Sequence, residues 1–172
     1  MENDNAKAFC FAERVKKYRA MVFRIAYGYT KDTHDADDIT QEVFLKLYKT
    51  ETIFYAEENV RAWLIRVVIN QAKSHLKTVW NTRRSDLSES IAAESESNNP
   101  AHDDCLDLYR YVDGLKPKYR TIIYLYYYEG YSVKEIAVLL KIRETNVTTQ
   151  LSRARSQLKD VILKDRAESY LS

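Results

Sequence analysis

The chain has 172 residues, of which 45% are hydrophobic and 30% charged, so it holds enough apolar material for a core and is not a wholly disordered chain. Its 3 glycines and 2 prolines argue against glycine-rich phosphate loops and turn-rich β-sandwiches. The net charge is only +2, but residues 60–84 hold six basic and no acidic residues, whereas residues 85–104 hold six acidic and no basic ones. Such asymmetry indicates separate surfaces with different electrostatic roles.

Targeting signals do not appear in the sequence. No apolar run is long enough to cross a membrane, and the N-terminus lacks the charged-then-apolar order of a secretory signal. We therefore expect a cytoplasmic protein with no direct membrane insertion. Cys10 and Cys105 have no CxxC spacing, and both are interpreted as free thiols.

The hydrophobic pattern predicts helices almost throughout the N-terminal half. Apolar side chains recur at steps of three and four from residue 15 to residue 29, which is typical of a helix with one buried face. Gly28 and the TKDTHD segment are expected to interrupt this helix. Asp35 is then expected to cap a second helix. A third long helix is predicted from about residue 60 to residue 80.

Acidic and amide side chains crowd the start of the second predicted helix. Carboxylates near a helix N-terminus are stabilised by the helix dipole, which explains part of the pattern without any function. His34, Asp38 and Glu42 recur at four-residue steps, a spacing compatible with a metal site. No matching Glu-x-x-His motif occurs elsewhere, so we expect neither a metal nor another cofactor. A docking face for a basic protein surface fits better.

The third predicted helix carries a cationic stripe. At 100° per residue, the following side chains fall within about 60° of arc: Arg66, Asn70, Lys73, Lys77 and Arg84. Trp63 lies at the edge of this stripe. Because cations hold phosphates and an exposed ring stacks an unpaired base, this side suits nucleic acid. The alternatives are a solvated helix with Trp63 buried and, less well supported, a helix at a membrane surface.

The second half of the chain begins with a change of composition. Residues 85–104 are rich in serine, asparagine and acidic residues and are interpreted as an exposed linker. Pro117 is placed where a new helix begins, and the tyrosine-rich run at 124–131 is interpreted as packing with its hydroxyls near the surface. The chain is therefore predicted to be all-α, with helical domains at 8–84 and 105–168 joined by a flexible acidic linker.

The strongest motif lies near the C-terminus, where Ser132 and Glu135 form a capping box. A second helix follows, and its inner stripe is spaced by four, three and four residues: Val147, Leu151, Ala154 and Leu158. Two helices joined by so short a turn form the helix-turn-helix that places its second helix in a DNA major groove. Lys141 occupies the turn position that favours glycine, and a left-handed lysine there costs about 1 kcal/mol.

The outward side of this second helix is polar and basic. Its side chains are Asn146, Thr148, Thr149, Gln150, Arg153 and Arg155. Threonine and glutamine bond base edges or phosphates, and arginine does either, so the surface is interpreted as DNA-binding. The alternative is an αα-hairpin that only packs.

These segments resemble, in family order, the extracytoplasmic-function (ECF) sigma factors of bacterial RNA polymerase. The core-binding helix of that family resembles DADDITQEVFLKLY at 35–48. Its promoter-melting and −10-recognising helix resembles NVRAWLIRVVINQAKSHLK at 59–77, and its −35-recognising domain resembles residues 115–159. The resemblance covers nearly the whole chain.

The resemblance implies a dissociable, non-enzymatic initiation factor with no catalytic residue and no cofactor. Its implied partners are core RNA polymerase, promoter DNA and an anti-sigma factor. The implied polymerase-binding residues are Asp35, Asp38, Gln41 and Glu42. The implied −10 residues are Phe54, Tyr55, Trp63, Arg66, Asn70, Lys73 and Lys77. The implied −35 residues are Thr148, Thr149, Gln150, Arg153 and Arg155.

Two rival functions stay open from the residues alone. A helix-turn-helix repressor or activator would bind duplex DNA without polymerase, but it gives no reason for the acidic helix or for the stripe beside Trp63. A helical metalloenzyme would use His34, Asp38 and Glu42, and stoichiometric metal in the purified protein would favour it.

Overall fold

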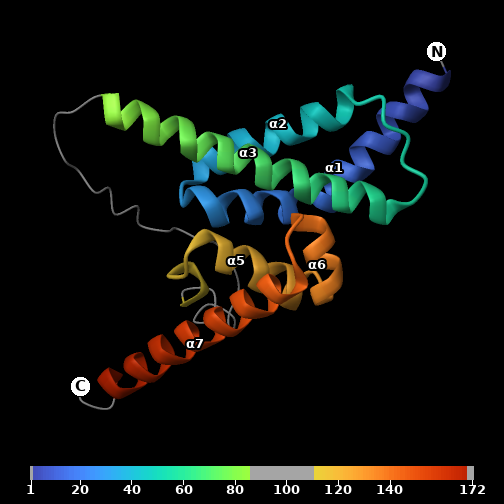
Figure 1. Ribbon diagram of the computed structural model, residues 1–172. Helices are drawn as coiled ribbons and strands as arrows, with labels where there is room; N and C mark the ends of the chain where they lie inside the picture. The colour runs from blue at the N-terminus through green and yellow to red at the C-terminus, as the bar shows by residue number, and fades with distance from the viewer. Residues whose placement is uncertain (1, 86–110, 170–172) are drawn as a thin grey trace. The chain divides into compact units, whose positions relative to one another are not determined.

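The computed structural model describes residues 2–85 and 111–169, and every element within these ranges is helical (Figure 1). This confirms the predicted all-α class. The elements are α1 (Glu2–Thr30), α2 (Thr33–Lys49), α3 (Glu57–Ser85), α5 (Pro117–Ile123), η1 (Tyr124–Tyr128), α6 (Val133–Leu140) and α7 (Glu144–Ser169).

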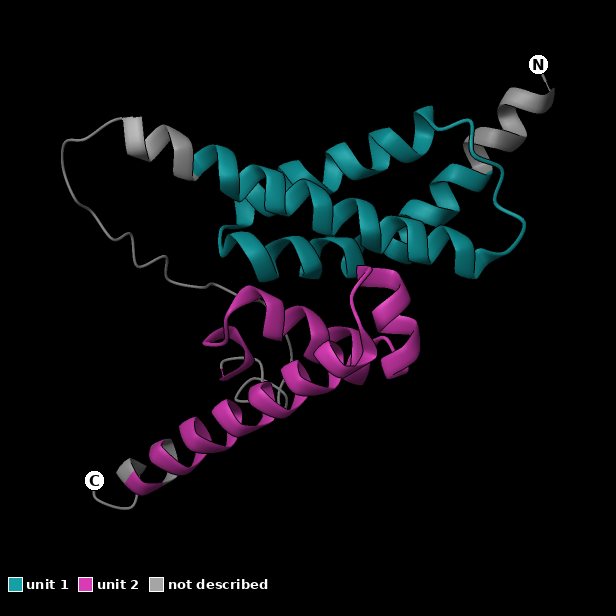
Figure 2. Ribbon diagram, viewed as in Figure 1, with its two compact units in different colours: residues 1–97 teal, residues 98–172 magenta. Residues whose placement is uncertain are grey.

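The chain divides into two compact units, residues 1–97 and residues 98–172 (Figure 2). Apart from Ser85, the predicted linker at 85–104 lies outside the described residues. The predicted domain limits, 8–84 and 105–168, stay a prediction.

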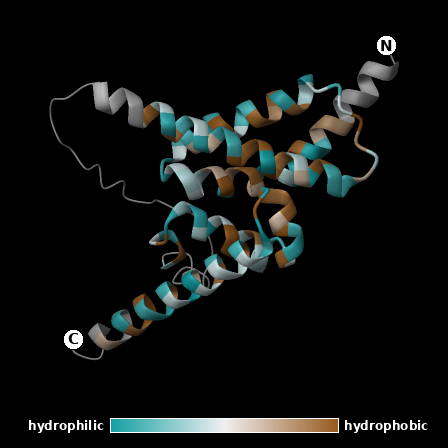
Figure 3. Ribbon diagram, viewed as in Figure 1, coloured by the Kyte–Doolittle hydropathy of each residue, from teal (hydrophilic) through white to brown (hydrophobic). Residues whose placement is uncertain are grey.

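Unit 1 is a three-helix unit in which α1, α2 and α3 each pack against the other two. Each helix contributes to the core, and the fully buried side chains include Val22, Val43, Val60, Leu64 and Val68. Figure 3 shows hydrophobic and hydrophilic residues alternating along these helices, as expected where one face is buried and the other solvated. Burial of this apolar surface is the main force that holds α3 against α1 and α2.

The boundary between α1 and α2 differs from the prediction. Helix α1 continues through Gly28 and ends at Thr30, and Lys31 follows in a left-handed conformation with φ of 59°. The residue that caps α2 is Asp32, whose extended backbone lets its carboxylate accept a 2.9 Å hydrogen bond from the Asp35 amide. The prediction that Asp35 is the cap is wrong, because Asp35 already lies in the first turn and supplies the donor.

Unit 2 begins with the helix predicted at Pro117, which starts α5 at a position where its missing N–H is not needed. The last turn before Gly130 is a π-helix, η1, and Gly130 then adopts a positive φ of 71°. The buried guanidinium of Arg120 donates to the Asp113 carbonyl at 2.6 Å, which ties α5 to the segment before it.

The helix-turn-helix has the predicted local chemistry. Ser132 accepts from the Glu135 amide at 3.2 Å and the Glu135 carboxylate accepts from the Ser132 amide at 2.8 Å, which completes the capping box. Lys141 ends α6 with φ of 55°, the left-handed conformation considered from the sequence. Val147, Leu151 and Ala154 are buried along α7 as predicted, whereas Leu158, the fourth member of the predicted inner stripe, is half-buried.

Candidate nucleic-acid interface

The outward face of α2 combines polar and apolar side chains. Asp38 and Gln41 are exposed, and neither makes a hydrogen bond or an ion pair within the part of the chain that the structure describes. Leu45 and Tyr48 follow on the same face and are 54% and 50% exposed, so two large side chains adjoin the polar pair. We call Asp38, Gln41, Leu45 and Tyr48 the α2 docking face. Its two apolar members were not predicted from the sequence, although residues 38, 41, 45 and 48 follow one another at steps of three, four and three.

The other two predicted docking residues contact α3. The carboxylate of Asp35 lies 2.9 Å from Nε2 of His75. Glu42 accepts a hydrogen bond from the Gln71 amide, and the Gln71 carbonyl in turn accepts one from Lys46. Asp35 and Glu42 therefore help join α2 to α3 as well as lying beside the docking face.

Four of the five side chains of the predicted α3 stripe face solvent, and the fifth, that of Arg84, lies outside the described part of the structure. Arg66, Asn70, Lys73 and Lys77 are exposed and make no ion pair with any described residue, and we call these four the α3 stripe. Gln71 and His75, which contact α2, lie about 150° around α3 from the stripe. One side of α3 therefore carries the cations, which have no carboxylate partner among the described residues, and the other side contacts the carboxylates of α2.

Trp63 is half-buried at the edge of the α3 stripe. Its ring meets the edge of Phe54 with centroids 5.8 Å apart, and the guanidinium carbon of Arg14 lies 5.8 Å from the Phe54 centroid. Phe54 thus supports Trp63 from the loop before α3, while Tyr55 in the same loop is 89% exposed. The alternative in which Trp63 belongs wholly to the core does not hold.

A charged cluster that was not predicted from the sequence anchors the start of α3 to α1. The Glu57 carboxylate lies 3.3 Å from Nζ of Lys17 and 4.0 Å from Nε of Arg14. Partial burial raises the pKa of Glu57, but hydrogen bonds with Tyr18 and Lys17 and the charges of Lys17 and Arg14 outweigh it, so the pKa falls below its ordinary value. Burial, followed by its hydrogen bond with Glu57, raises the pKa of Tyr18.

The predicted −35 residues lie along α7, and they differ in exposure and in hydrogen-bond partner. Thr148 and Thr149 are exposed, and their hydroxyls donate to the helix carbonyls of Glu144 at 3.0 Å and Thr145 at 2.7 Å. Gln150 donates to the Asn146 side chain at 3.0 Å, Arg153 is exposed, and Nε of Arg155 donates to the Tyr127 hydroxyl at 2.9 Å.

Both halves of the chain match known families. The family model described as Sigma-70 region 2 matches residues 14–82, and the one described as Sigma-70, region 4 matches residues 105–158. The ECF RNA polymerase sigma factor SigE of Mycolicibacterium smegmatis is 30% identical, over 98% of this chain and 68% of its own length. The ECF RNA polymerase sigma factor SigM of Bacillus subtilis is 32% identical, over 86% of this chain and 91% of its own.

This chain belongs to the ECF RNA polymerase sigma factors. Solved structures share the fold of this sigma factor. The sigma factor RpoE from Bartonella quintana, in complex with the anti-sigma factor NepR, superposes with a TM-score of 0.70 at 19% identity and covers 88% of this chain and 96% of that one. CnrH, in complex with the cytosolic domain of CnrY, superposes with a TM-score of 0.61 at 23% identity, over 90% and 88% of the two chains.

Within residues 2–85 and 111–169, no group of three or more His, Cys, Asp or Glu side chains is placed to hold a metal ion. In those same ranges, no helix is both long and apolar enough to span a membrane.

The Glu57 cluster makes the stability of unit 1 of the sigma factor depend on pH. Because the folded state lowers the pKa of Glu57, its contribution is present at neutral pH and is lost as the pH falls through the lowered pKa. We expect Glu57→Gln to lower the melting temperature at pH 7, and the difference from wild type to shrink as the pH falls through the lowered pKa of Glu57. Thermal unfolding of both proteins across this pH range measures it; a difference that persists in acid would contradict it.

Proposed function

We propose that this sigma factor holds core RNA polymerase through the α2 docking face and contacts opened −10 DNA through the α3 stripe and Trp63. The −35 element is contacted by the first turns of α7, from Thr148 to Arg153. The protein contributes recognition and strand opening and leaves catalysis to the polymerase. It acts in the cytoplasm, where polymerase and chromosome meet.

One observation carries this proposal: a single small unit presents two exposed surfaces of unlike chemistry on different helices. The α2 docking face offers a carboxylate, an amide and two half-exposed side chains, Leu45 and Tyr48, a mixture suited to a protein partner. The α3 stripe offers cations with no carboxylate partner among the described residues, a surface suited to phosphates. A repressor that binds duplex DNA alone would need only the second surface.

An anti-sigma factor is the remaining partner of the proposal. The solved structures of similar fold include the sigma factor RpoE in complex with the anti-sigma factor NepR, and CnrH in complex with the cytosolic domain of CnrY. An inhibitor of this kind would act by covering the surfaces that polymerase and DNA need. Co-purification of this chain with a protein that suppresses its transcription would establish the partner.

Replacing Trp63 tests the proposed −10 contact. We expect Trp63→Ala to weaken binding of the holoenzyme to a single-stranded −10 oligonucleotide by about 10- to 100-fold, because base stacking on an aromatic ring contributes about 1–3 kcal/mol. The oligonucleotide comes from a promoter selected from a random library with the wild-type holoenzyme. Fluorescence anisotropy measures the affinity.

The controls separate stacking from folding and from polymerase binding. Trp63→Phe keeps an aromatic face and should retain most of the affinity. Both variants should co-purify with core polymerase as the wild type does, because Trp63 lies outside the α2 docking face. Equal single-strand affinity for Trp63→Ala and wild type would remove Trp63 from the proposed interface.

A further inference from the structure

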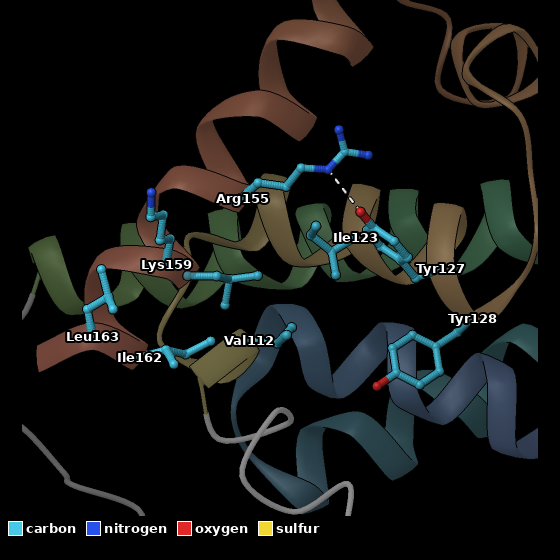
Figure 4. Close-up of a pocket in the computed structure, with 9 residues that line it drawn as sticks. Val112, Ile123, Tyr127, Tyr128, Arg155, Lys159, Ile162 and Leu163 are labelled. Carbon is cyan, nitrogen blue, oxygen red and sulfur yellow. Dashed lines mark hydrogen bonds between the residues drawn. The ribbon is translucent and has the colours of Figure 1, made fainter. Parts of the chain in front are cut away.

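The tyrosine-rich run in unit 2 contacts Arg155, a residue that the family resemblance implies for −35 DNA binding. Nε of Arg155 donates to the Tyr127 hydroxyl at 2.9 Å, and the guanidinium carbon lies 5.6 Å from the ring centroids of both Tyr126 and Tyr127. Figure 4 shows Arg155 extending from α7 toward Tyr127, with the hydrogen bond drawn between them. Two cation–π contacts and one directed hydrogen bond hold a single orientation of the guanidinium.

The π-helical turn explains why two consecutive tyrosines reach the same arginine. Element η1 (Tyr124–Tyr128) continues the helix that begins at Pro117, and its wider i→i+5 turn makes consecutive side chains within it, including Tyr126 and Tyr127, rotate by less than in an ordinary α-helix. The rings of Tyr126 and Tyr127 meet edge to face, with centroids 5.0 Å apart and planes at 78°. Stacking of Tyr124 on Tyr128 at 5.6 Å and the Tyr124 hydroxyl bond to Glu129 at 2.7 Å brace the turn.

The position of Arg155 on α7 favours this contact over a shared surface with Arg153. At 100° per residue, Arg155 lies about 160° around α7 from Arg153, and about 20° from Thr148, which precedes it by two turns on the same side. Arg155 flanks the buried stripe of Leu151 and Ala154, on the side that faces Tyr127. It also lines, with Leu158 and Ile162, an apolar groove of about 480 Å³ in unit 2. Arg155 is an exposed residue, and its side chain follows the surface of unit 2 toward Tyr127.

We infer that Arg155 is a positioning residue, locked by Tyr126 and Tyr127, that sets the rotation of α7 about its axis while Arg153 makes the DNA contact. This inference rests on the proposed contact between α7 and the −35 element. The lock decides the direction in which Thr148, Thr149 and Arg153 point from unit 2. In this inference the tyrosine run fixes the position of the Arg155 side chain, in addition to packing within unit 2.

Salt dependence distinguishes an arginine that binds phosphate from one that positions a helix. Each phosphate contact that is lost lowers the slope of log K against log salt by about 0.9. The holoenzyme is measured on a duplex that carries only the −35 element of the selected promoter. We expect Arg153→Ala to lower the slope by about 1, and Arg155→Ala to weaken binding about fivefold with the slope unchanged.

Two further variants test the lock itself. Arg155→Lys keeps the charge but lacks the planar Nε donor, so it should not restore affinity, whereas a phosphate contact would be largely restored by lysine. Tyr127→Phe keeps the ring and removes only the hydroxyl acceptor. It should weaken −35 binding in the same direction as Arg155→Ala, and the double variant should lose no more than Arg155→Ala alone.

The outcomes separate this inference from the proposed function. A fall in slope for Arg155→Ala equal to that for Arg153→Ala, rescue by Arg155→Lys, or additive losses with Tyr127→Phe would each overturn the positioning role. If no α7 variant changes −35 binding, including Arg153→Ala, the proposed −35 contact itself fails. Thermal unfolding of each variant shows whether unit 2 is folded at the assay temperature.

Discussion

Reversing two charges on α2 is expected to abolish association with core RNA polymerase. In Asp38→Arg with Glu42→Arg, two cations replace two carboxylates on and beside the α2 docking face, opposite a surface that we propose is basic. Juxtaposed like charges cost several kcal/mol, so the affinity should fall by at least about 100-fold. Co-purification of the tagged sigma factor with core enzyme measures the loss.

Two matched controls isolate the charge effect. Asp37→Lys changes the charge next to Asp38, but Asp37 is turned toward α1, where its carboxylate lies 3.5 Å from Arg19, so association should persist. Gln71→Ala removes the partner of Glu42 on α3 without changing the charge of α2, and it too should leave association intact. Undiminished co-purification of the double reversal would remove the docking assignment.

Truncating Leu64 in α3 is expected to have the largest effect on stability. Leu64 is fully buried in unit 1, one position from Trp63, and Leu64→Ala leaves a cavity among close-packed neighbours. Such truncations cost about 2–5 kcal/mol, a large part of the roughly 5–15 kcal/mol that stabilises a typical domain. Both tryptophans of the chain, Trp63 and Trp80, lie in unit 1, so denaturant unfolding followed by tryptophan fluorescence reports on that unit.

The matched control for Leu64 is a leucine on the solvent side of the same unit. Leu45 is 54% exposed on the α2 docking face, so Leu45→Ala should change the unfolding free energy by less than about 1 kcal/mol. The same variant should weaken polymerase association, because it removes apolar surface from the docking face. Equal destabilisation by the two alanine substitutions would contradict the burial of Leu64.

Features that depend on near neighbours in the chain were predictable from the sequence. The capping box of Ser132 and Glu135, the helix start at Pro117 and the left-handed Lys141 involve groups within a few residues of one another. Local sterics and short hydrogen bonds decide them. The cap of α2 was the exception, because Asp32 and Asp35 are both good capping residues and only the backbone conformation distinguishes them.

Contacts between distant residues were not predictable. Arg155 and Tyr127 are 28 positions apart, and Lys17 and Glu57 are 40 apart. A helical pattern places each of these side chains on an outward or flanking position, where contact with solvent, DNA or another helix all fit equally well. The π-helical turn at 124–128 changes the rotation between consecutive side chains, which no spacing in the tyrosine run reveals.

The order of amino acids therefore determined the helices, their buried stripes, the helix-turn-helix and the family, because periodic burial and local capping leave a direct trace in residue spacing. Tertiary packing decided the partners of individual charges. It joined Asp35 and Glu42 to α3, gathered Lys17 and Arg14 around Glu57, and turned Arg155 onto two tyrosines. A charged side chain on a helix surface can pair with any opposite charge within its reach, so its partner is decided only when separate helices pack together.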